Sequence, residues 1–149
     1  MKPRIVFLDA ATVDYGDLDF SLFADIGRFS SFPMTRPDEA AERLAGAEIA
    51  ITNKVVFDRD LIGRCNSLKL IAVAATGYNN IDIDAARGRG IAVANVPGYS
   101  TFSVAQFTMM FVLALAGNLI PYNSACHDGS WSRSPIFTAG ALPRDSSSS

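Results

Sequence analysis

A strong excess of one charge is missing from this sequence of 149 residues, and we expect no secretory leader. Its 13 Lys and Arg residues oppose 15 Asp and Glu residues, and the net charge of -2 comes with no basic patch. Binding to nucleic acid or to an anionic membrane calls for such a patch, so we expect neither partner. The first apolar run, residues 5–8, is too short for a signal peptide, and we therefore expect a cytoplasmic protein.

Cysteine and histidine are scarce, which limits the chemistry that the chain can carry. Cys65 and Cys126 form no CxxC motif, and for a cytoplasmic chain we expect two reduced thiols rather than a disulfide. No His, Cys, Asp or Glu cluster has zinc-like spacing, so we expect no metal site. The single histidine, His127, follows the apolar region in an irregular segment, with no partner in view to orient it for proton transfer. We expect a surface residue there.

Charged residues are also missing from residues 90–126, and residues 102–120 are apolar over a length that suits a membrane span. Polar residues such as Gln106 interrupt this run, Pro97 and Pro121 bracket it, and no basic cluster flanks it closely. We therefore expect a helix that is buried or lies in a subunit interface, and no membrane contact.

Short apolar runs alternate with amphipathic segments over the first hundred residues, which predicts strands and helices in turn. The run at residues 4–8 is continuously apolar, as in a buried parallel strand. Further strands are expected at 28–32, 47–52, 68–74 and 90–94, with helices at 19–26, 35–44, 58–65 and 81–87. The pattern predicts an α/β fold, a flavodoxin-like doubly wound parallel sheet of about five strands, whose ligands gather at the carboxyl ends of the strands.

After this region we expect one long helix at residues 101–119, followed by an irregular tail. Residues 123–149 show no sustained periodicity and end in four serines, which is typical of a solvated tail. The predicted organisation is thus residues 1–100, 101–120 and 121–149.

Three loops should meet at the carboxyl edge of the sheet, at residues 52–54, 75–80 and 95–101. Thr76 and Gly77 lie between a buried strand and a helix, where glycine permits the positive φ of an anion-binding nest. A carboxylate or phosphate would fit there. A tight turn in which Asn80 caps the next helix is the alternative, and the loop itself leaves both open. The Gly88-Arg89-Gly90 segment precedes a strand, so we expect a helix stop rather than a dinucleotide-binding turn.

The loop residues closely resemble the substrate domain of D-2-hydroxyacid dehydrogenases, and within that family they are most similar to glycerate dehydrogenases, also called hydroxypyruvate reductases. The resemblance covers about residues 4–137, and Gln106 departs from the glutamate of many relatives. It depends on Thr52-Asn53-Lys54, on Ala74-Ala75-Thr76-Gly77-Tyr78-Asn79-Asn80-Ile81-Asp82, and on the segments 85–101 and Ser103-Val104-Ala105-Gln106.

The resemblance implies hydride transfer between the nicotinamide of NAD or NADP and C2 of a small 2-oxo or 2-hydroxy acid. It assigns substrate binding to Asn53, Lys54, Thr76 and Gly77, with backbone N–H groups of Thr76 and Gly77 on the substrate carboxylate. It assigns cofactor contacts to Thr76 and Thr108. For Thr108 the alternative is a hydroxyl that bonds to its own helix backbone.

The resemblance also implies a division of labour along the chain. Residues 1–100 would be the N-terminal part of the substrate-binding (catalytic) domain, 101–120 a linker and dimerisation helix, and 121–149 a dimer arm with Trp131 followed by a tail. A homodimer is therefore expected. No GxGxxG turn occurs in the sequence; the family's dinucleotide-binding domain and catalytic Arg, Glu and His are expected downstream. We expect no catalytic residue, no cofactor binding and no turnover in this chain, or alternatively a non-catalytic carboxylate-binding or dimerisation module.

Overall fold

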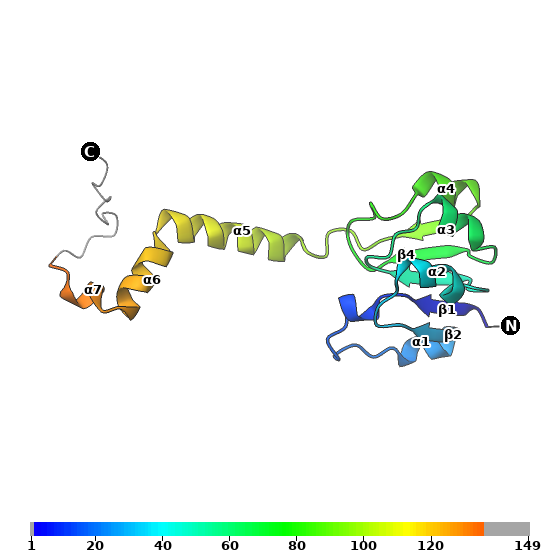
Figure 1. The fold of residues 1–149 in the computed structure, drawn as a ribbon, viewed down its shortest axis with the longest axis horizontal. Helices are drawn as coiled ribbons and strands as arrows, with labels where there is room; N and C mark the ends of the chain where they lie inside the picture. Colours follow the sequence, from blue (N-terminus) through cyan, green and yellow to red (C-terminus); the bar gives the residue numbers. More distant parts are fainter. Residues whose placement is uncertain (1, 136–149) are drawn as a thin grey trace. The chain divides into compact units, whose positions relative to one another are not determined.

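The computed structural model of the protein describes residues 2–135, which belong to two compact units, Met1–Tyr99 and Ser100–Ser149 (Figure 1). Each unit has its own secondary structure. The division falls between Tyr99 and Ser100.

The first unit contains a five-stranded, wholly parallel sheet in the order β2-β1-β3-β4-β5. This is the flavodoxin-like strand order, so the predicted fold class is confirmed. All five strands lie within the predicted ranges. They are β1 (Arg4–Phe7), β2 (Arg28–Ser31), β3 (Ile49–Thr52), β4 (Leu70–Val73) and β5 (Ala92–Ala94).

Helices cover the two faces of the sheet unequally. Helices α2, α3 and α4 pack on one face, where the larger buried cluster includes Leu44, Ile62 and Ile71. On the other face α1 and its preceding loop cover β1 and β2 with Phe20 and Phe23. The helices of this unit are η1 (Ala10–Thr12), α1 (Ser21–Ile26), α2 (Pro37–Arg43), α3 (Arg59–Arg64) and α4 (Ile83–Gly88).

The ends of these short helices are set by side chains and by one glycine. Asp58 and Asp82 are the N-caps of α3 and α4, and each carboxylate accepts a backbone N–H at 2.8 Å. Asn80 therefore does not cap α4; its amide donates to the Val55 carbonyl at 2.9 Å instead. Gly90, with φ +69, ends α4 in a Schellman arrangement, which confirms the predicted helix stop.

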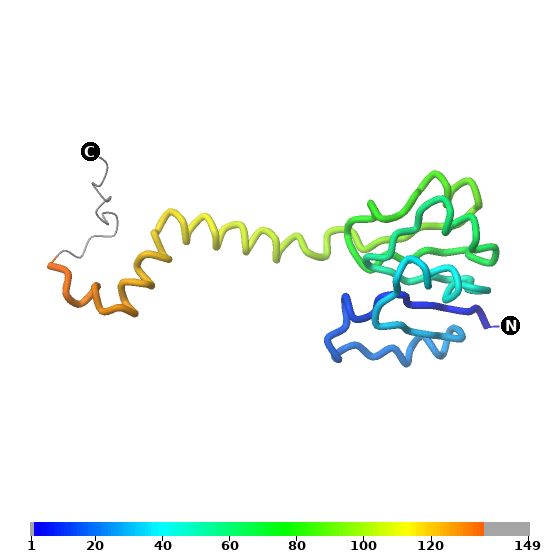
Figure 2. Tube along the Cα trace, in the orientation of Figure 1, coloured from blue at the N-terminus to red at the C-terminus, as the bar shows by residue number. Residues whose placement is uncertain are grey.

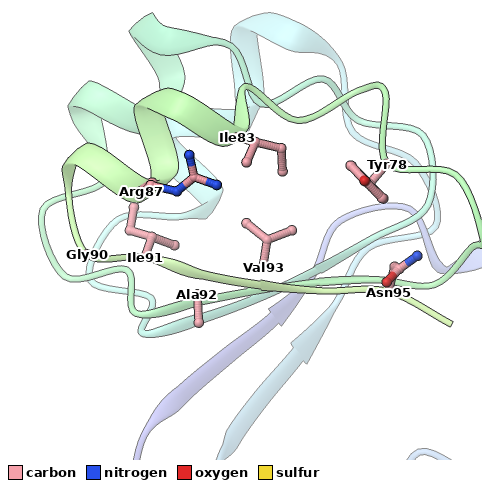
Figure 3. Close-up of a pocket in the computed structure, with 8 residues that line it drawn as sticks. All are labelled: Tyr78, Ile83, Arg87, Gly90, Ile91, Ala92, Val93 and Asn95. Atoms are coloured by element: carbon pink, nitrogen blue, oxygen red, sulfur yellow. The ribbon is translucent and has the colours of Figure 1, made fainter. Parts of the chain in front are cut away.

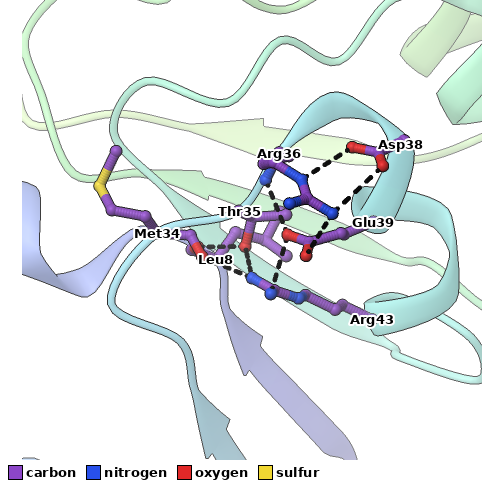
Figure 4. Close-up of polar contacts among 7 residues, drawn as sticks. All are labelled: Leu8, Met34, Thr35, Arg36, Asp38, Glu39 and Arg43. Carbon is purple, nitrogen blue, oxygen red and sulfur yellow. Dashed lines mark hydrogen bonds and ion pairs between the residues drawn. The ribbon is translucent and has the colours of Figure 1, made fainter.

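A charged network fixes the loop between β2 and α2 (Figure 4). The Arg43 guanidinium donates to the Met34 carbonyl at 2.5 Å and to the Thr35 hydroxyl at 2.6 Å, and it pairs with Glu39 at 2.9 Å. The Thr35 hydroxyl in turn donates to the Leu8 carbonyl at the end of β1. The network thus ties the β2–α2 loop to the carboxyl end of the neighbouring strand.

Figure 2 traces the path of the second unit. Its described residues, 100–135, form three helices where we expected one helix and an irregular segment. They are α5 (Thr101–Ala116), α6 (Leu119–His127) and α7 (Ser130–Arg133). The predicted long helix breaks because Asn118 adopts a left-handed conformation, with φ 51, after Gly117. The chain then becomes helical again, since Pro121 lies in the first turn of α6, where its missing N–H costs no helical bond. The tail from residue 136 onward lies outside the described residues.

The apolar residues of α5 surround the helix, and none of them is buried. The expectation of a helix that is buried or lies in a subunit interface stays a prediction. Within residues 2–135 no single helix is long and apolar enough to cross a membrane; α5 and α6, bent by 66°, pass that test only as a pair. Both cysteines are free thiols in the structure, and burial raises the pKa of the Cys65 thiol.

Candidate functional site

Asp9 lies two residues beyond β1, and its carboxylate holds the loop that follows β3. The residue is 1% exposed. The backbone N–H groups of Asn53, Lys54 and Val55 donate to its carboxylate oxygens at 2.5 to 3.2 Å. The Thr52 hydroxyl adds a bond at 3.2 Å. Consecutive N–H groups that converge on one anion form a nest, and here the anion is the carboxylate of Asp9 itself. Residues 53–55 therefore keep no backbone N–H for an external ligand.

The side-chain amide of Asn53 is oriented by Thr12, the last residue of η1. Its Nδ2 donates to the Thr12 hydroxyl oxygen at 3.0 Å and to the Thr12 carbonyl at 3.5 Å. The Thr12 hydroxyl donates its own hydrogen to the Asp9 carbonyl at 2.7 Å. Through these bonds Asp9 and Thr12 together determine where the Asn53 amide lies.

The loop with Thr76 and Gly77 follows β4 at the same edge of the sheet and is exposed. The Thr76 hydroxyl donates to the Val96 carbonyl at 3.1 Å, and the Asn95 amide donates to the Thr76 carbonyl at 2.7 Å. The backbone N–H groups of Thr76 and Gly77 donate to no acceptor within residues 2–135. These two N–H groups are thus available to a carboxylate.

Gly77 does not have the positive φ that we expected of an anion-binding nest. Among the loop glycines nearby, Gly98 has that conformation, with φ 74. A Cβ at Gly77 would meet no atom within 4 Å. Neither the backbone nor the available space requires glycine at position 77, so its predicted role in binding depends on its N–H group alone.

A cavity of about 800 Å³ lies at this edge, beside α1. Asn53, Thr12, Ala74 and Val96 are among the residues that line it. The Val96 carbonyl accepts the hydrogen bond from the Thr76 hydroxyl. The cavity therefore joins Asn53 to the neighbourhood of the Thr76 loop. The other lining residues are mainly apolar: Phe7, Val13, Tyr15, Leu18, Asp19, Phe20, Phe23, Ile51 and Tyr99.

Lys54 lines a different hollow, of about 310 Å³, together with Asp9, Thr35, Asp58 and Arg64. Asn53 and Lys54 are consecutive in the bend that follows β3, but their side chains line different cavities. The structure therefore does not bring Lys54 to the cavity that Asn53 lines.

A third cavity, of about 530 Å³, lies between α4 and β5 (Figure 3). Tyr78 and Asn95 line it at the loop end, and Arg87, which pairs with Asp84 at 3.3 Å, lines it at the helix end. None of the four predicted substrate residues lines it, so the cavity beside α1 is the better candidate site.

Charge is unevenly distributed around the candidate cavity. The backbone N–H of Ser21 donates to the Asp19 carboxylate and lowers the pKa of Asp19, with help from the Ser21 hydroxyl. Hydrogen bonds from the backbone N–H groups of Gly16 and Leu18 likewise lower the pKa of Asp14. Asp19 lines the cavity, whereas Asp14 does not, and the negative charge of Asp19 favours an anionic ligand group at the Thr76 loop rather than beside Asp19 itself.

The second unit holds the other residues that the sequence singled out. The Thr108 hydroxyl donates to the Val104 carbonyl at 2.8 Å, which is the alternative that we left open. His127 is exposed and is the last residue of α6, not part of an irregular segment. Trp131 packs edge-on against Tyr122, with 5.6 Å between ring centroids. Within residues 2–135 no group of three or more His, Cys, Asp or Glu could hold a metal ion.

Asp9 and Thr12 are the residues of the site that sequence reasoning missed. Asp9 directly follows the apolar run at residues 5–8. An ionisable residue so close behind a buried strand needs partners, since a buried charge is costly unless it is hydrogen-bonded. That signal points to Asp9, although not to the loop that binds it.

The fold and this edge define an α/β domain in which two backbone N–H groups, those of Thr76 and Gly77, have no acceptor within residues 2–135, beside a largely apolar cavity that the Asn53 amide lines. Residues 12–146 match the catalytic domain of the D-isomer specific 2-hydroxyacid dehydrogenases, and the chain belongs to this family. The resemblance seen in the sequence is thereby confirmed.

Curated relatives include the two enzymes that the loop residues suggested. Hydroxypyruvate reductase of Blautia hydrogenotrophica is 33% identical over 135 residues, which cover 89% of this chain and 42% of that protein. Glycerate dehydrogenase of Methylorubrum extorquens is 36% identical over 137 residues, with 92% of this chain and 43% of that protein covered. The chain thus spans less than half the length of these relatives.

Solved structures agree with the fold. The 2-hydroxyacid dehydrogenase of Ketogulonicigenium vulgare matches with a TM-score of 0.73 at 26% identity, over 93% of this chain and 43% of that chain. An acyclic imino acid reductase in complex with NADPH and D-Arg matches with a TM-score of 0.75 at 24% identity, over 85% of this chain and 41% of that chain. At that identity the second likeness shows the fold alone.

Replacing Asp9 by Asn should destabilise the first unit strongly. The substitution replaces one carboxylate oxygen by an NH2 group, which would face backbone N–H donors, and the loop loses its charge-assisted hydrogen bonds. We therefore expect the free energy of unfolding to fall by about 2 to 4 kcal/mol. Urea unfolding of Asp9→Asn followed by circular dichroism measures this loss. Asp25→Asn, at an exposed position of α1, is the control and should leave the midpoint unchanged. Equal midpoints for the two variants would show that the Asp9 contacts contribute little.

Proposed function

We propose that this chain supplies the substrate-carboxylate half of the active site of an NAD- or NADP-dependent D-2-hydroxyacid dehydrogenase of the glycerate dehydrogenase or hydroxypyruvate reductase kind. The observation that carries the proposal is the pair of free N–H groups at Thr76 and Gly77, beside the cavity that Asn53 lines. The curated relatives named for glycerate and hydroxypyruvate support the choice of a small 2-hydroxy or 2-oxo acid.

In this proposal the chain's own residues bind and orient the acid and do not transfer protons. The substrate carboxylate accepts hydrogen bonds from Thr76 and Gly77, and its remaining carbons extend into the apolar cavity. Exclusion of water by the apolar walls would strengthen these hydrogen bonds. NAD or NADP would supply the hydride acceptor or donor in the whole enzyme.

The described residues do not fit a dinucleotide. Such a cofactor is held by a glycine-rich turn that leads from a strand into a helix N-terminus. The Gly88-Arg89-Gly90 segment instead leads out of the C-terminus of α4, and its positive φ serves the helix stop. We therefore propose that residues 2–135 carry out neither cofactor binding nor proton transfer.

Purified chain should bind D-glycerate without catalysing turnover. We expect D-glycerate to shift the amide NMR signals of Thr76 and Gly77, while NADH absorbance stays constant with hydroxypyruvate and NADH fluorescence is unchanged by the protein. Oxidation of NADH would contradict the proposal and direct attention to His127 as a proton donor.

Two variants at one position show whether the N–H group is what binds. Gly77→Pro removes the donor and should weaken D-glycerate binding. Gly77→Ala keeps the donor, and because the space beside Gly77 is open, it should bind as the parent does. Equal binding by both variants would show that this N–H group does not hold the carboxylate.

A second role, as a dimerisation module, is favoured by the apolar surface of α5. Phe102 is 89% exposed and Leu115 is 74% exposed, and large apolar surfaces of this kind mark interaction sites. We propose that a second copy of the chain covers this helix, with Trp131 in the dimer arm. The family resemblance of residues 101–120 supports this assignment.

Sedimentation equilibrium tests the dimer. The parent chain should sediment as a dimer, and Phe111→Glu should sediment as a monomer because it places a charge among the apolar residues of α5. Leu22→Glu, at an exposed apolar position of α1, should remain dimeric. A monomeric parent at all concentrations would exclude the dimer.

A further inference from the structure

We infer that Asn95 is a positioning residue that holds the peptide between Thr76 and Gly77 in the orientation that binds the substrate carboxylate. Asn95 is the first residue after β5 (Figure 3). The inference rests on the proposed function, because it concerns the N–H groups that would hold the acid. It adds a residue from the loop after β5 that acts on those groups without touching the acid.

Three hydrogen bonds join the loop after β4 to residues 95 and 96. The Val96 N–H donates to the Ala75 carbonyl at 3.0 Å, and the Thr76 hydroxyl donates to the Val96 carbonyl at 3.1 Å. The Asn95 amide donates to the Thr76 carbonyl at 2.7 Å. Asn95 is half-buried, whereas Thr76 and Gly77 are exposed. The exposed loop after β4 is thus held by residues 95 and 96, mainly through its carbonyl groups.

A carbonyl group that is held in place determines where the N–H of the same peptide points. No peptide bond within residues 2–135 is cis, and the C=O and N–H bonds of a planar trans peptide point in opposite directions. The Thr76 carbonyl points to Asn95, so the Gly77 N–H points away from it. In the same way the Ala75 carbonyl points to the Val96 N–H, so the Thr76 N–H points away from Val96. Both proposed carboxylate donors are therefore turned away from the residues that hold the loop.

Asn95 provides the only hydrogen bond to the Thr76–Gly77 peptide within the described residues 2–135. The Val96 N–H acts on the preceding peptide, and the Thr76 hydroxyl belongs to a side chain. Only the NH2 end of the Asn95 amide can donate to a carbonyl, so this contact also fixes the orientation of the amide. Pro97 restricts Val96 to extended conformations, which limits movement of the holding segment.

Glycine at position 77 makes the orientation of this peptide easy to lose. Rotation of the Thr76–Gly77 peptide changes ψ of Thr76 and φ of Gly77, and it can bring φ to a positive value. Most residues resist a positive φ, but glycine accepts it. The rotated peptide would present the Thr76 carbonyl oxygen where the Gly77 N–H was, and an oxygen acceptor repels a carboxylate. Because the rotation also breaks the bond to Asn95, that bond stabilises the orientation that binds.

NMR titration of the 149-residue chain with D-glycerate tests the inference. Asn95→Leu has a similar shape without the donor, and we expect it to bind D-glycerate about two- to tenfold more weakly, the range for one hydrogen bond. Asn123→Leu, the same substitution at an exposed position of α6, is the control and should bind as the parent does.

A second substitution separates positioning from a general loss of structure. Alanine resists a positive φ, and the space beside Gly77 is open, so Gly77→Ala should oppose rotation of the peptide. We therefore expect Asn95→Leu combined with Gly77→Ala to bind D-glycerate nearly as tightly as Gly77→Ala alone. A double variant as weak as Asn95→Leu would overturn the inference, because Asn95 would then act on something other than this peptide.

Residual dipolar couplings test the orientation without any ligand, because they report the direction of each N–H bond. In the parent chain the couplings of Thr76 and Gly77 should agree with the directions in the structure. In Asn95→Leu the Gly77 coupling should change, while that of Ile71 in β4 should not. An unchanged Gly77 coupling would contradict the inference. If Asn95→Leu does not fold, Asn95→Asp takes its place, since an ionised carboxylate also lacks the donor.

The two measurements distinguish failure of this inference from failure of the proposed function. Equal binding of D-glycerate by the parent chain and by Asn95→Leu would overturn the role of Asn95 and leave the carboxylate site intact. Absence of D-glycerate binding by the parent chain would overturn the proposed function, while the dipolar couplings would still decide whether Asn95 orients the peptide.

Discussion

The carboxylate of Asp9 is the interaction on which the candidate site depends. It joins the end of β1 to the loop after β3 by accepting three consecutive backbone N–H groups and the Thr52 hydroxyl. Burial of an ionised carboxylate is costly without such partners, and so many donors on one group offset that cost. Because the bonds go to the main chain, they fix the path of residues 53–55 whatever their side chains are. The direction of Asn53 into the cavity and of Lys54 away from it follows from that path.

The hydrogen bonds of Asp9 also explain why neighbouring loops at one edge of the sheet differ in whether their backbone N–H groups are free. The loop after β3 gives its N–H groups to Asp9, and its Asn53 side chain lines the cavity beside α1. The loop after β4 is held through its carbonyl and hydroxyl groups, at Thr76, and so keeps its N–H groups free.

Much of the fold could be predicted because its signals are local. Continuous apolar runs mark the buried strands, and Gly90 marks the end of α4 by a conformation that glycine readily adopts. The break between α5 and α6 was missed because it depends on a left-handed Asn118 within an otherwise apolar run. In the site, sequence similarity indicated the loops, but not that Asn53 and Lys54 line different cavities. The contacts of Asp9 span 43 to 46 residues of sequence, and no local pattern records such a pairing.

Hydrogen exchange of individual backbone amides tests most directly whether the Asp9 carboxylate holds the loop of residues 53–55. If Asp9 holds the loop, the amides of residues 53–55 exchange as slowly as that of Ile71 in the buried strand β4, because exchange then requires unfolding of the unit. The amides of Thr76 and Gly77, which have no acceptor in the described part of the chain, should exchange at nearly unprotected rates in the same experiment. Exchange of residues 53–55 as rapid as that of Thr76 and Gly77 would contradict the account, since the loop would then open without the rest of the domain.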